Sequence, residues 1–309
     1  MMLRPFSKSG SFYKGNLHGH SSNSDGKFSV SEVIDAYKKR GYDFTCISDH
    51  LWIDNRFCAE TVTDASKYNT HDFIAINSAE LHTRGKKYDK ENLWHLVANG
   101  LSKDFKPSND EENIQDLIKR AKGDGAFISI AHPEWYSLTF DEAIMLKDCH
   151  SVEIYNHAST VKCNRGSGIY IADFLLNENV KTLLTSTDDS HSLEEDAYGG
   201  WVFVKTKELN EKKILKSLIK GDYYSSTGVV IYEVKLENRL LKLKFSSSNN
   251  IMVSGAGHTN ISSHGYNLTN AELDLENFDS PFFRITISNQ FGKYAWTNPY
   301  WFNELDLDY

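Results

Sequence analysis

In the stretch Tyr13-Lys-Gly-Asn-Leu-His-Gly-His20, a short strand-like segment lies directly before two histidines. We predict a strand over residues 13–17, which places His18 and His20 just beyond its end. In extended backbone, residues two positions apart point to the same side, so both imidazoles can reach one cation. One such pair is unremarkable by chance among 12 histidines in 309 residues. Its meaning therefore depends on the rest of the chain.

The first two-thirds of the chain alternates between strand-like and helix-like segments. The clearest helix opens at Ser29, which has capping-box spacing to Glu32, and it stops near Gly41. Further helices are expected near residues 114–121, 141–147, 169–176 and 211–220. Seven strands are predicted at residues 13–17, 44–48, 73–79, 92–99, 127–131, 152–155 and 183–186. This alternation predicts an α/β fold built from parallel βα units.

Ionisable side chains lie at or near the ends of six of these strands. In an α/β barrel the carboxyl ends of the strands face one mouth, where the active site lies. A polar turn after the first strand brings one more carboxylate back toward the histidine pair. We therefore expect nine side chains to converge there: His18, His20, Asp25, His50, Glu80, His95, His132, Asp189 and His191.

So many imidazoles and carboxylates at one mouth would be poorly satisfied without cations. A mixed set of nitrogen and oxygen ligands suits zinc, manganese or iron. The alternative is that each residue has an ordinary role; for example, Asp49 and Asp188 could cap helices. That alternative would have to be repeated at six strand ends. We therefore expect two to three divalent metal ions (Mn, Fe or Zn).

The ordered motifs of the chain resemble those of the PHP (polymerase and histidinol phosphatase) superfamily over roughly residues 13–205. The motifs are Asn16-Leu-His-Gly-His20, Ser24-Asp-Gly26, Ser48-Asp-His50, Glu80, His132-Pro133 and Asp189-Ser-His191. The resemblance implies a distorted (β/α)7 barrel with a trinuclear metal centre. It also implies hydrolysis of phosphate esters by a metal-activated hydroxide.

The resemblance also distributes the nine residues over three metal ions, with Glu80 shared. His18, His20, Glu80 and Asp189 look like ligands of one metal, Asp25, His50 and His191 of a second, and Glu80, His95 and His132 of a third. Many members of the superfamily have histidine at the position of Asp25. The aspartate variant resembles a subgroup of nucleotide phosphatases and short-oligonucleotide exonucleases.

Further residues near the predicted mouth are candidates for contacting substrate. His157 and Arg165 follow the sixth strand and could neutralise a phosphate or protonate a leaving group. The alternative is that both are ordinary loop residues. Glu153 lies within the same strand, and we expect it to orient a metal ligand without binding a metal.

The character of the sequence changes after about residue 200. From residue 229 onward alternating apolar and polar residues predict strands with one buried face. We expect a catalytic unit over 1–228 and a small all-β, sandwich-like domain over 229–309, similar to stand-alone PHP proteins of the CehA-like type. Trp296 and Trp301 are expected to pack in a core or between domains, with an aromatic ligand platform as the alternative.

Composition excludes several classes of protein. The apolar share of 40% and charged share of 25% indicate a folded domain, and the net charge of −8 disfavours binding of long nucleic acid. Four scattered cysteines suggest neither structural zinc nor a disulfide framework. No apolar run reaches 18 residues and residues 1–11 carry no signal-peptide core, so we expect a cytoplasmic protein without membrane partners.

These observations favour a metal-dependent phosphoesterase acting on a small phosphorylated substrate, such as a nucleotide or sugar phosphate. One alternative is an exonuclease or nucleotidase acting on short oligonucleotides. Another is a non-catalytic metal-containing module that binds a partner. The sequence carries no signal for the oligomeric state.

Overall fold

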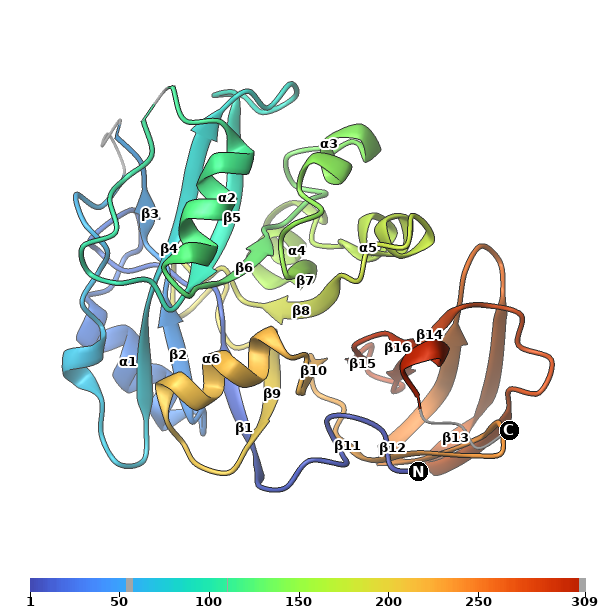
Figure 1. The fold of residues 1–309 in the computed structure, drawn as a ribbon. Coiled ribbons are helices and arrows are strands. Elements are labelled where there is room, and N and C mark those ends of the chain that lie inside the picture. The colour runs from blue at the N-terminus through green and yellow to red at the C-terminus, as the bar shows by residue number, and fades with distance from the viewer. Residues whose placement is uncertain (54–57, 110, 306–309) are drawn as a thin grey trace.

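The computed structural model describes residues 1–53, 58–109 and 111–305. One path of paired strands runs through the molecule in the order β11-β12-β14-β15-β10-β9-β1-β2-β4-β5-β6-β7-β8 (Figure 1). Three further strands, β3, β13 and β16, pair beside this path. The strands are β1 (Ser11–Asn16), β2 (Phe44–Ile47), β3 (His50–Leu51), β4 (Ile74–Arg84), β5 (Leu93–Asn99), β6 (Phe127–Ile130), β7 (Ser151–Asn156), β8 (Leu183–Thr187), β9 (Trp201–Thr206), β10 (Tyr223–Ser226), β11 (Ile231–Glu237), β12 (Leu240–Ser254), β13 (Asn260–Asp274), β14 (Phe282–Ser288), β15 (Tyr294–Thr297) and β16 (Tyr300–Trp301).

The α-helices are short, and among the described residues they all lie before β10. Ser29 and Glu32 form the predicted capping box of α1, whose Val30, Val33 and Tyr37 are buried. The described residues also contain 3-10 turns at Ser66–Tyr68 and Phe302–Glu304. The helices are α1 (Val30–Lys39), α2 (Ile114–Gly123), α3 (Phe140–Met145), α4 (His157–Cys163), α5 (Ile169–Asn177) and α6 (Glu211–Ile219).

The seven strands predicted for the first part of the chain are present. They are not all parallel, and a helix does not separate every consecutive pair. β4 and β5 are antiparallel neighbours, and β5 is also antiparallel to β6. The chain folds back between β4 and β5 as a hairpin, so no crossover helix is needed there. In this pair His82 lies directly opposite His95. The hairpin therefore brings the beginning of β5 to the mouth that the carboxyl ends of the parallel strands form.

The predicted distorted (β/α)7 barrel is not confirmed, because the sheet remains open between β8 and β1. β1 pairs with β2 on one edge and with β9 on the other, which leaves no free edge for β8. An isolated parallel bridge between Gly19 and Ser190 connects the segments that follow β1 and β8. The fold is thus a mixed α/β structure with a large parallel and antiparallel sheet.

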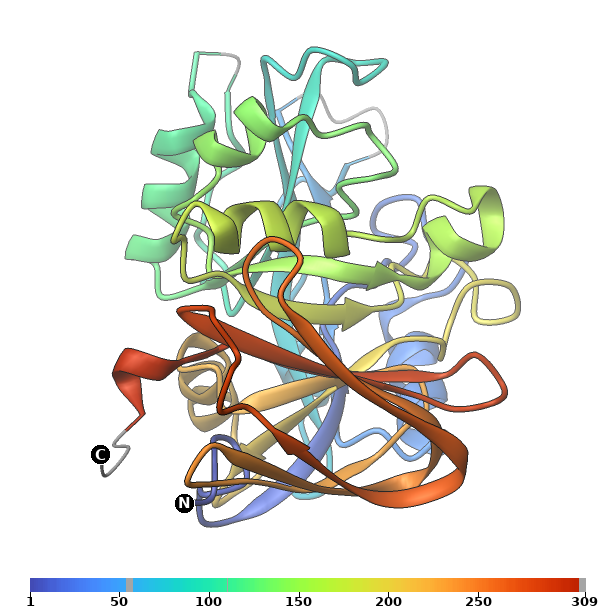
Figure 2. The ribbon, with the colours of Figure 1, turned by 90° about the vertical axis from the view of Figure 1, so that its right-hand side faces the viewer.

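The C-terminal strands form an all-β part on one side of the α/β part (Figure 1). β10 pairs with both β9 and β15, so the sheet runs from one part into the other. The N-terminus lies beside the C-terminal β part (Figure 2). There the amide of Leu3 donates a hydrogen bond to the carbonyl of Val234, at 2.9 Å. The boundary at residue 229 stays a prediction, and residues 306–309 of that predicted domain lie outside the described residues.

Apolar side chains pack the α/β part below the strand ends. One buried cluster joins β2, β4, β6, β9, β10 and α6, and it contains Phe44, Cys46, Ile76, Phe127, Val202, Val204, Ile214, Leu218 and Tyr223. Such close packing holds the strand ends, and the side chains that follow them, in fixed relative positions. Within the described residues, no helix has the length and apolar character needed to cross a membrane.

Candidate metal centre

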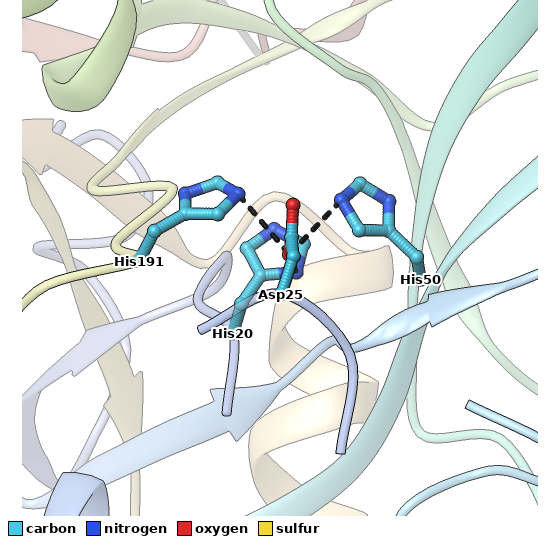
Figure 3. A group of neighbouring side chains, drawn as sticks. All are labelled: His20, Asp25, His50 and His191. Carbon is cyan, nitrogen blue, oxygen red and sulfur yellow. Dashed lines mark ion pairs between the residues drawn. The ribbon is translucent and has the colours of Figure 1, made fainter. Parts of the chain in front are cut away.

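Three histidines surround Asp25, the carboxylate on the turn after β1 (Figure 3). The Nε2 atoms of His50 and His191 each lie 3.4 Å from Oδ1 of Asp25. Nδ1 of His20 lies 3.8 Å from the same oxygen. The ring of His20 stacks between the other two, with centroids 4.4 Å from His50 and 4.2 Å from His191. These four residues offer ligand atoms that could hold one metal ion.

A second cluster lies deeper, where the end of β1 meets the end of β8. It consists of His18, His20, Glu80 and Asp189, all buried. Nε2 of His20 lies 3.0 Å from Oδ1 of Asp189 and 3.2 Å from Nε2 of His18. Nε2 of His18 lies 3.2 Å from the same Asp189 oxygen and 3.4 Å from Oε2 of Glu80. Four ligand groups therefore face one point from two strand ends and the middle of β4.

Glu80 joins this cluster to its neighbours through its two carboxylate oxygens. Oε1 lies 2.8 Å from Nδ1 of His95 and 3.1 Å from Nε2 of His132. Oε2 lies 3.1 Å from Nδ1 of His50 and 3.4 Å from Nε2 of His18. Each oxygen of this carboxylate therefore has its own histidine partners, and Glu80 is shared between neighbouring clusters. The structure thus brings all nine predicted residues together at one site.

The electrostatics of the site favour an ionised Glu80 surrounded by histidines. Burial would raise the pKa of Glu80, but its histidine neighbours hold that pKa well below its usual value. Burial, with repulsion from His191 and His50, lowers the pKa of His20 to about 4. Burial acts against the charged form of His191, yet hydrogen bonding to Asp25 and the charge of Asp189 raise its pKa to about 9. At neutral pH His20 is therefore neutral, with a lone pair available for a cation.

Divalent metal ions fit the donor set that these residues present. Nδ1 of His20 and Nδ1 of His132 are buried without a hydrogen-bond partner in the described parts of the chain. Buried polar atoms without partners are costly unless something else satisfies them. His132 and Asp189 also hold left-handed backbone angles, with φ of 23° and 56°. Strained backbone of this kind is typical of functional sites.

Acidic residues behind the ligands hold the loops that carry them. Asp49 accepts hydrogen bonds from the amide of Ser21 at 2.7 Å and from the hydroxyl of Ser24 at 2.8 Å, on the turn before Asp25. Asp188 accepts a 2.7 Å bond from the hydroxyl of Tyr37, and burial raises its pKa to about 6. Neither aspartate caps a helix in the structure. Both support loops of the site.

A cavity of about 460 Å³ opens beside the clusters. Lys162 on α4 and the half-exposed Trp135 contribute to its wall. The lining residues are Asp25, His50, Glu80, Asp89, Lys90, Glu91, Leu93, His95, His132, Trp135, Ala158, Ser159, Lys162, Asp189 and His191. His157 and Arg165 are not among these residues: Nδ1 of His157 lies 2.9 Å from the hydroxyl of Tyr155, and Arg165 is exposed beyond α4. Their assignment to substrate remains a prediction.

Three residues of the site did not emerge from the sequence. His82 is buried beside His50 and Glu80, and its signal was the Glu-Leu-His spacing that places it on the same strand face as Glu80. Lys162 lines the cavity one helical turn before Arg165 and forms an ion pair with the fully buried Asp196. Asp196 in turn accepts a 2.9 Å hydrogen bond from the amide of His191. No local pattern marks Lys162, because its role depends on where α4 packs.

One solved structure shares the overall fold of this chain. A two-domain protein from Bacteroides vulgatus, described as containing a predicted PHP-like metal-dependent phosphoesterase, aligns with a TM-score of 0.55 and 16% sequence identity. The alignment covers 93% of this chain and 94% of that one. An amidohydrolase from Chromobacterium violaceum aligns over 58% of this chain and 87% of its own, with 15% identity and a TM-score of 0.43, too low to support an argument.

Sequence comparison adds one local match. The DNA polymerase/3′-5′ exonuclease PolX of Bacillus subtilis (strain 168) is 42% identical over 57 residues, which are 18% of this chain. The chain spans only 10% of that protein's length. No protein-family model matches the chain. The chain thus shares its overall fold with the solved protein from Bacteroides vulgatus, and this likeness supports, at the level of the fold, the resemblance seen in its motifs.

Proposed function

We propose that the protein is a metal-dependent phosphoesterase that hydrolyses a small phosphate ester. The observation that carries the proposal is the position of Glu80, whose two oxygens face different histidines beside one cavity. Adjoining cation sites suit phosphoryl transfer, because both the attacking and the leaving oxygen need charge stabilisation. The similarity in fold to a PHP-like protein supports the same reaction class.

In this proposal the nine residues hold two or three divalent ions of manganese, iron or zinc. Bound ions would lower the pKa of water and offset the negative charge of the phosphate. Glu80 is shared between the clusters. The ligand groups are His18, His20, Glu80 and Asp189 for the first ion, Asp25, His50 and His191 for the second, and Glu80, His95 and His132 for the third.

The remaining residues of the cavity would position the substrate. The ammonium group of Lys162 provides positive charge on the wall that faces the clusters, and it suits a phosphate oxygen. Trp135 is 43% exposed at the same cavity and offers an apolar ring against which a leaving group can lie. Its ring is steeply inclined to the rings of His95 and His132, with centroids 5.5 and 5.1 Å away. Phosphate and leaving group would thus be held by different residues.

The size of the cavity favours a small substrate. About 460 Å³ is within the range of ordinary small-molecule sites and accommodates a nucleotide or a sugar phosphate. The net charge of −8 disfavours a long nucleic acid. An exonuclease acting on short oligonucleotides is the second candidate, because the local sequence match is to PolX, a DNA polymerase with 3′-5′ exonuclease activity.

The test is hydrolysis by protein reconstituted with Mn²⁺, Fe²⁺ or Zn²⁺, followed as release of p-nitrophenol, inorganic phosphate or mononucleotides. The substrates are p-nitrophenyl phosphate, its bis-ester, mononucleotides, sugar phosphates and a short oligonucleotide. Wild-type turnover that is lost in His18→Ala supports the proposal, and the preferred substrate separates the two candidates. Metal binding without turnover on any substrate would favour a non-catalytic binding module. Absence of both metal binding and turnover would overturn the proposal.

A further inference from the structure

His82 is a buried histidine that the nine predicted ligands do not include. It lies on β4 two residues after Glu80 and is fully buried. Its ring packs on His50, with centroids 4.9 Å apart, and meets the ring of His95 nearly edge-on at 4.5 Å and 84°. Both neighbours are candidate metal ligands. His82 therefore lies behind two clusters without facing the cavity itself.

The hydrogen bonds of His82 determine where its proton lies. Nδ1 lies 3.1 Å from the backbone carbonyl oxygen of Trp94. A carbonyl oxygen can only accept, so Nδ1 of His82 carries a hydrogen and donates it. Neutral imidazole carries a single N–H, so Nε2 of His82 is left with a lone pair and acts as an acceptor.

That acceptor faces His50. Nε2 of His82 lies 2.7 Å from Nδ1 of His50, so the hydrogen between them belongs to His50. Oε2 of Glu80 lies 3.1 Å from the same His50 nitrogen and is also an acceptor. With its hydrogen on Nδ1, His50 presents the bare Nε2 on the other side of its ring, 3.4 Å from Oδ1 of Asp25. This is the nitrogen that a metal beside Asp25 requires.

We infer that His82 is a positioning residue, which fixes His50 in the tautomer that presents Nε2 to the second metal. The inference rests on the proposed metal centre and adds a residue to it. The chain of donors runs from His50 through His82 to the backbone of Trp94, and the opposite tautomer of His50 would set two lone pairs against each other. Hydrogen-bonded partners of this kind orient histidine ligands, and their loss lowers metal affinity or activity about 10- to 100-fold.

Two substitutions at the same position separate orientation from simple packing. His82→Gln retains an N–H donor for Trp94 and a carbonyl acceptor for His50, whereas His82→Leu fills space without either. The matched control is His150→Gln, at a histidine outside the site that stacks on Phe127. Zn²⁺ binding is measured by chelator competition and metal analysis. Circular dichroism checks that each variant is folded.

We expect His82→Leu to weaken binding of one zinc equivalent about 10- to 100-fold. His82→Gln should retain most of that affinity, and His150→Gln all of it. Nitrogen-15 NMR of the zinc-loaded wild type should show His50 protonated at Nδ1 and His82 protonated at Nδ1 with Nε2 free of metal. The NMR measurement decides the question even if the leucine variant does not fold.

Three results would separate failure of this inference from failure of the proposed function. Equal zinc binding by wild type and His82→Leu would overturn the inference alone. A zinc-shifted Nε2 resonance of His82, with loss of a whole equivalent in both variants, would make His82 a ligand with His50 and Glu80. If the wild type binds no metal, the proposed metal centre itself is wrong.

Discussion

Oε1 of Glu153 lies 2.8 Å from Nδ1 of His18, and both side chains are fully buried. The other oxygen of Glu153 accepts a 2.8 Å hydrogen bond from the amide of His132 and a 3.0 Å bond from the side chain of Asn156. One carboxylate in the middle of β7 therefore contacts both a histidine that follows β1 and the loop that follows β6. This is the orienting contact that the sequence led us to expect of Glu153.

Glu153→Gln should lower metal affinity and turnover about 10- to 100-fold, because the amide no longer holds the imidazole of His18 with a charged acceptor. The measurements are metal content after dialysis and kcat on the preferred substrate. The control is Asp173→Asn, which alters an acidic residue outside the site, paired with Arg284. Wild-type metal affinity in Glu153→Gln would show that the contact does not matter for the site.

Glu80 and His95 should differ in how many metal ions they affect. Glu80→Ala removes a group that belongs to three candidate clusters, whereas His95→Ala removes a group from one. We expect Glu80→Ala to lose more metal equivalents than His95→Ala and to lower turnover by about 1,000-fold or more, since metal ions supply several kcal/mol of charge stabilisation. Metal analysis of both purified variants checks this. Equal metal loss in the two variants would contradict a bridging role.

Lys162 and Arg165 are two positively charged side chains three residues apart, and only Lys162 lines the cavity described above. Lys162→Gln should lower kcat/KM about 10- to 100-fold, the cost of losing a charge-assisted hydrogen bond to phosphate. Arg165→Gln should change it little, because Arg165 does not line the cavity. Steady-state kinetics on the preferred substrate gives both values.

Two further outcomes complete that comparison. Lys162→Gln also leaves the buried carboxylate of Asp196 unpaired, so Lys162→Arg, which keeps the ion pair, should retain most stability and most activity. A fall for Arg165→Gln as large as that for Lys162→Gln would instead support the assignment of Arg165 to substrate that the sequence suggests.

Metal affinity should rise with pH between about 7 and 9. The pKa of His191 is about 9 because Asp25 and Asp189 outweigh the effect of burial, so the imidazole is protonated at pH 7. A metal that binds His191 must displace this proton, and its apparent affinity should increase about tenfold per pH unit until the pKa is passed. Calorimetry with Zn²⁺ in buffers of different ionisation enthalpy counts the released protons. Affinity independent of pH over this range would argue against His191 as a ligand.

The N-terminal segment should stabilise the C-terminal β part. Leu3 is 1% exposed and packs in the apolar cluster of that part, beside Val234 and Phe283. Leu3→Ala should lower the free energy of unfolding by about 2–4 kcal/mol, from lost burial and the cavity left behind. Urea unfolding measures the loss, and Val161→Ala at a half-exposed position is the control. No change for Leu3→Ala would show that the N-terminal segment is not needed to stabilise that part.

The local sequence by itself determined where several helices and strands form and which of their ends carry site residues. The capping box at Ser29 and the apolar stripe of α1 depend on residues within a few turns of one another, so their pattern is readable along the chain. His18, His132 and Asp189 each lie two residues after a strand, and the strand-like segments before them are readable along the chain. Because strands of one sheet end at a common edge, this local pattern was enough to predict a shared site.

Tertiary structure alone decided the remaining features, because they depend on contacts between residues far apart in the sequence. The antiparallel pairing of β4 with β5 sets His82 opposite His95, and the pairing of β1 with β9 keeps the sheet open. Likewise Lys162 lies at the cavity because α4 places it beside Asp196, which is distant in the sequence. The residue type, lysine, does not reveal this position. Strand register and helix packing are chosen by burial over the whole chain, so no segment read by itself could predict them.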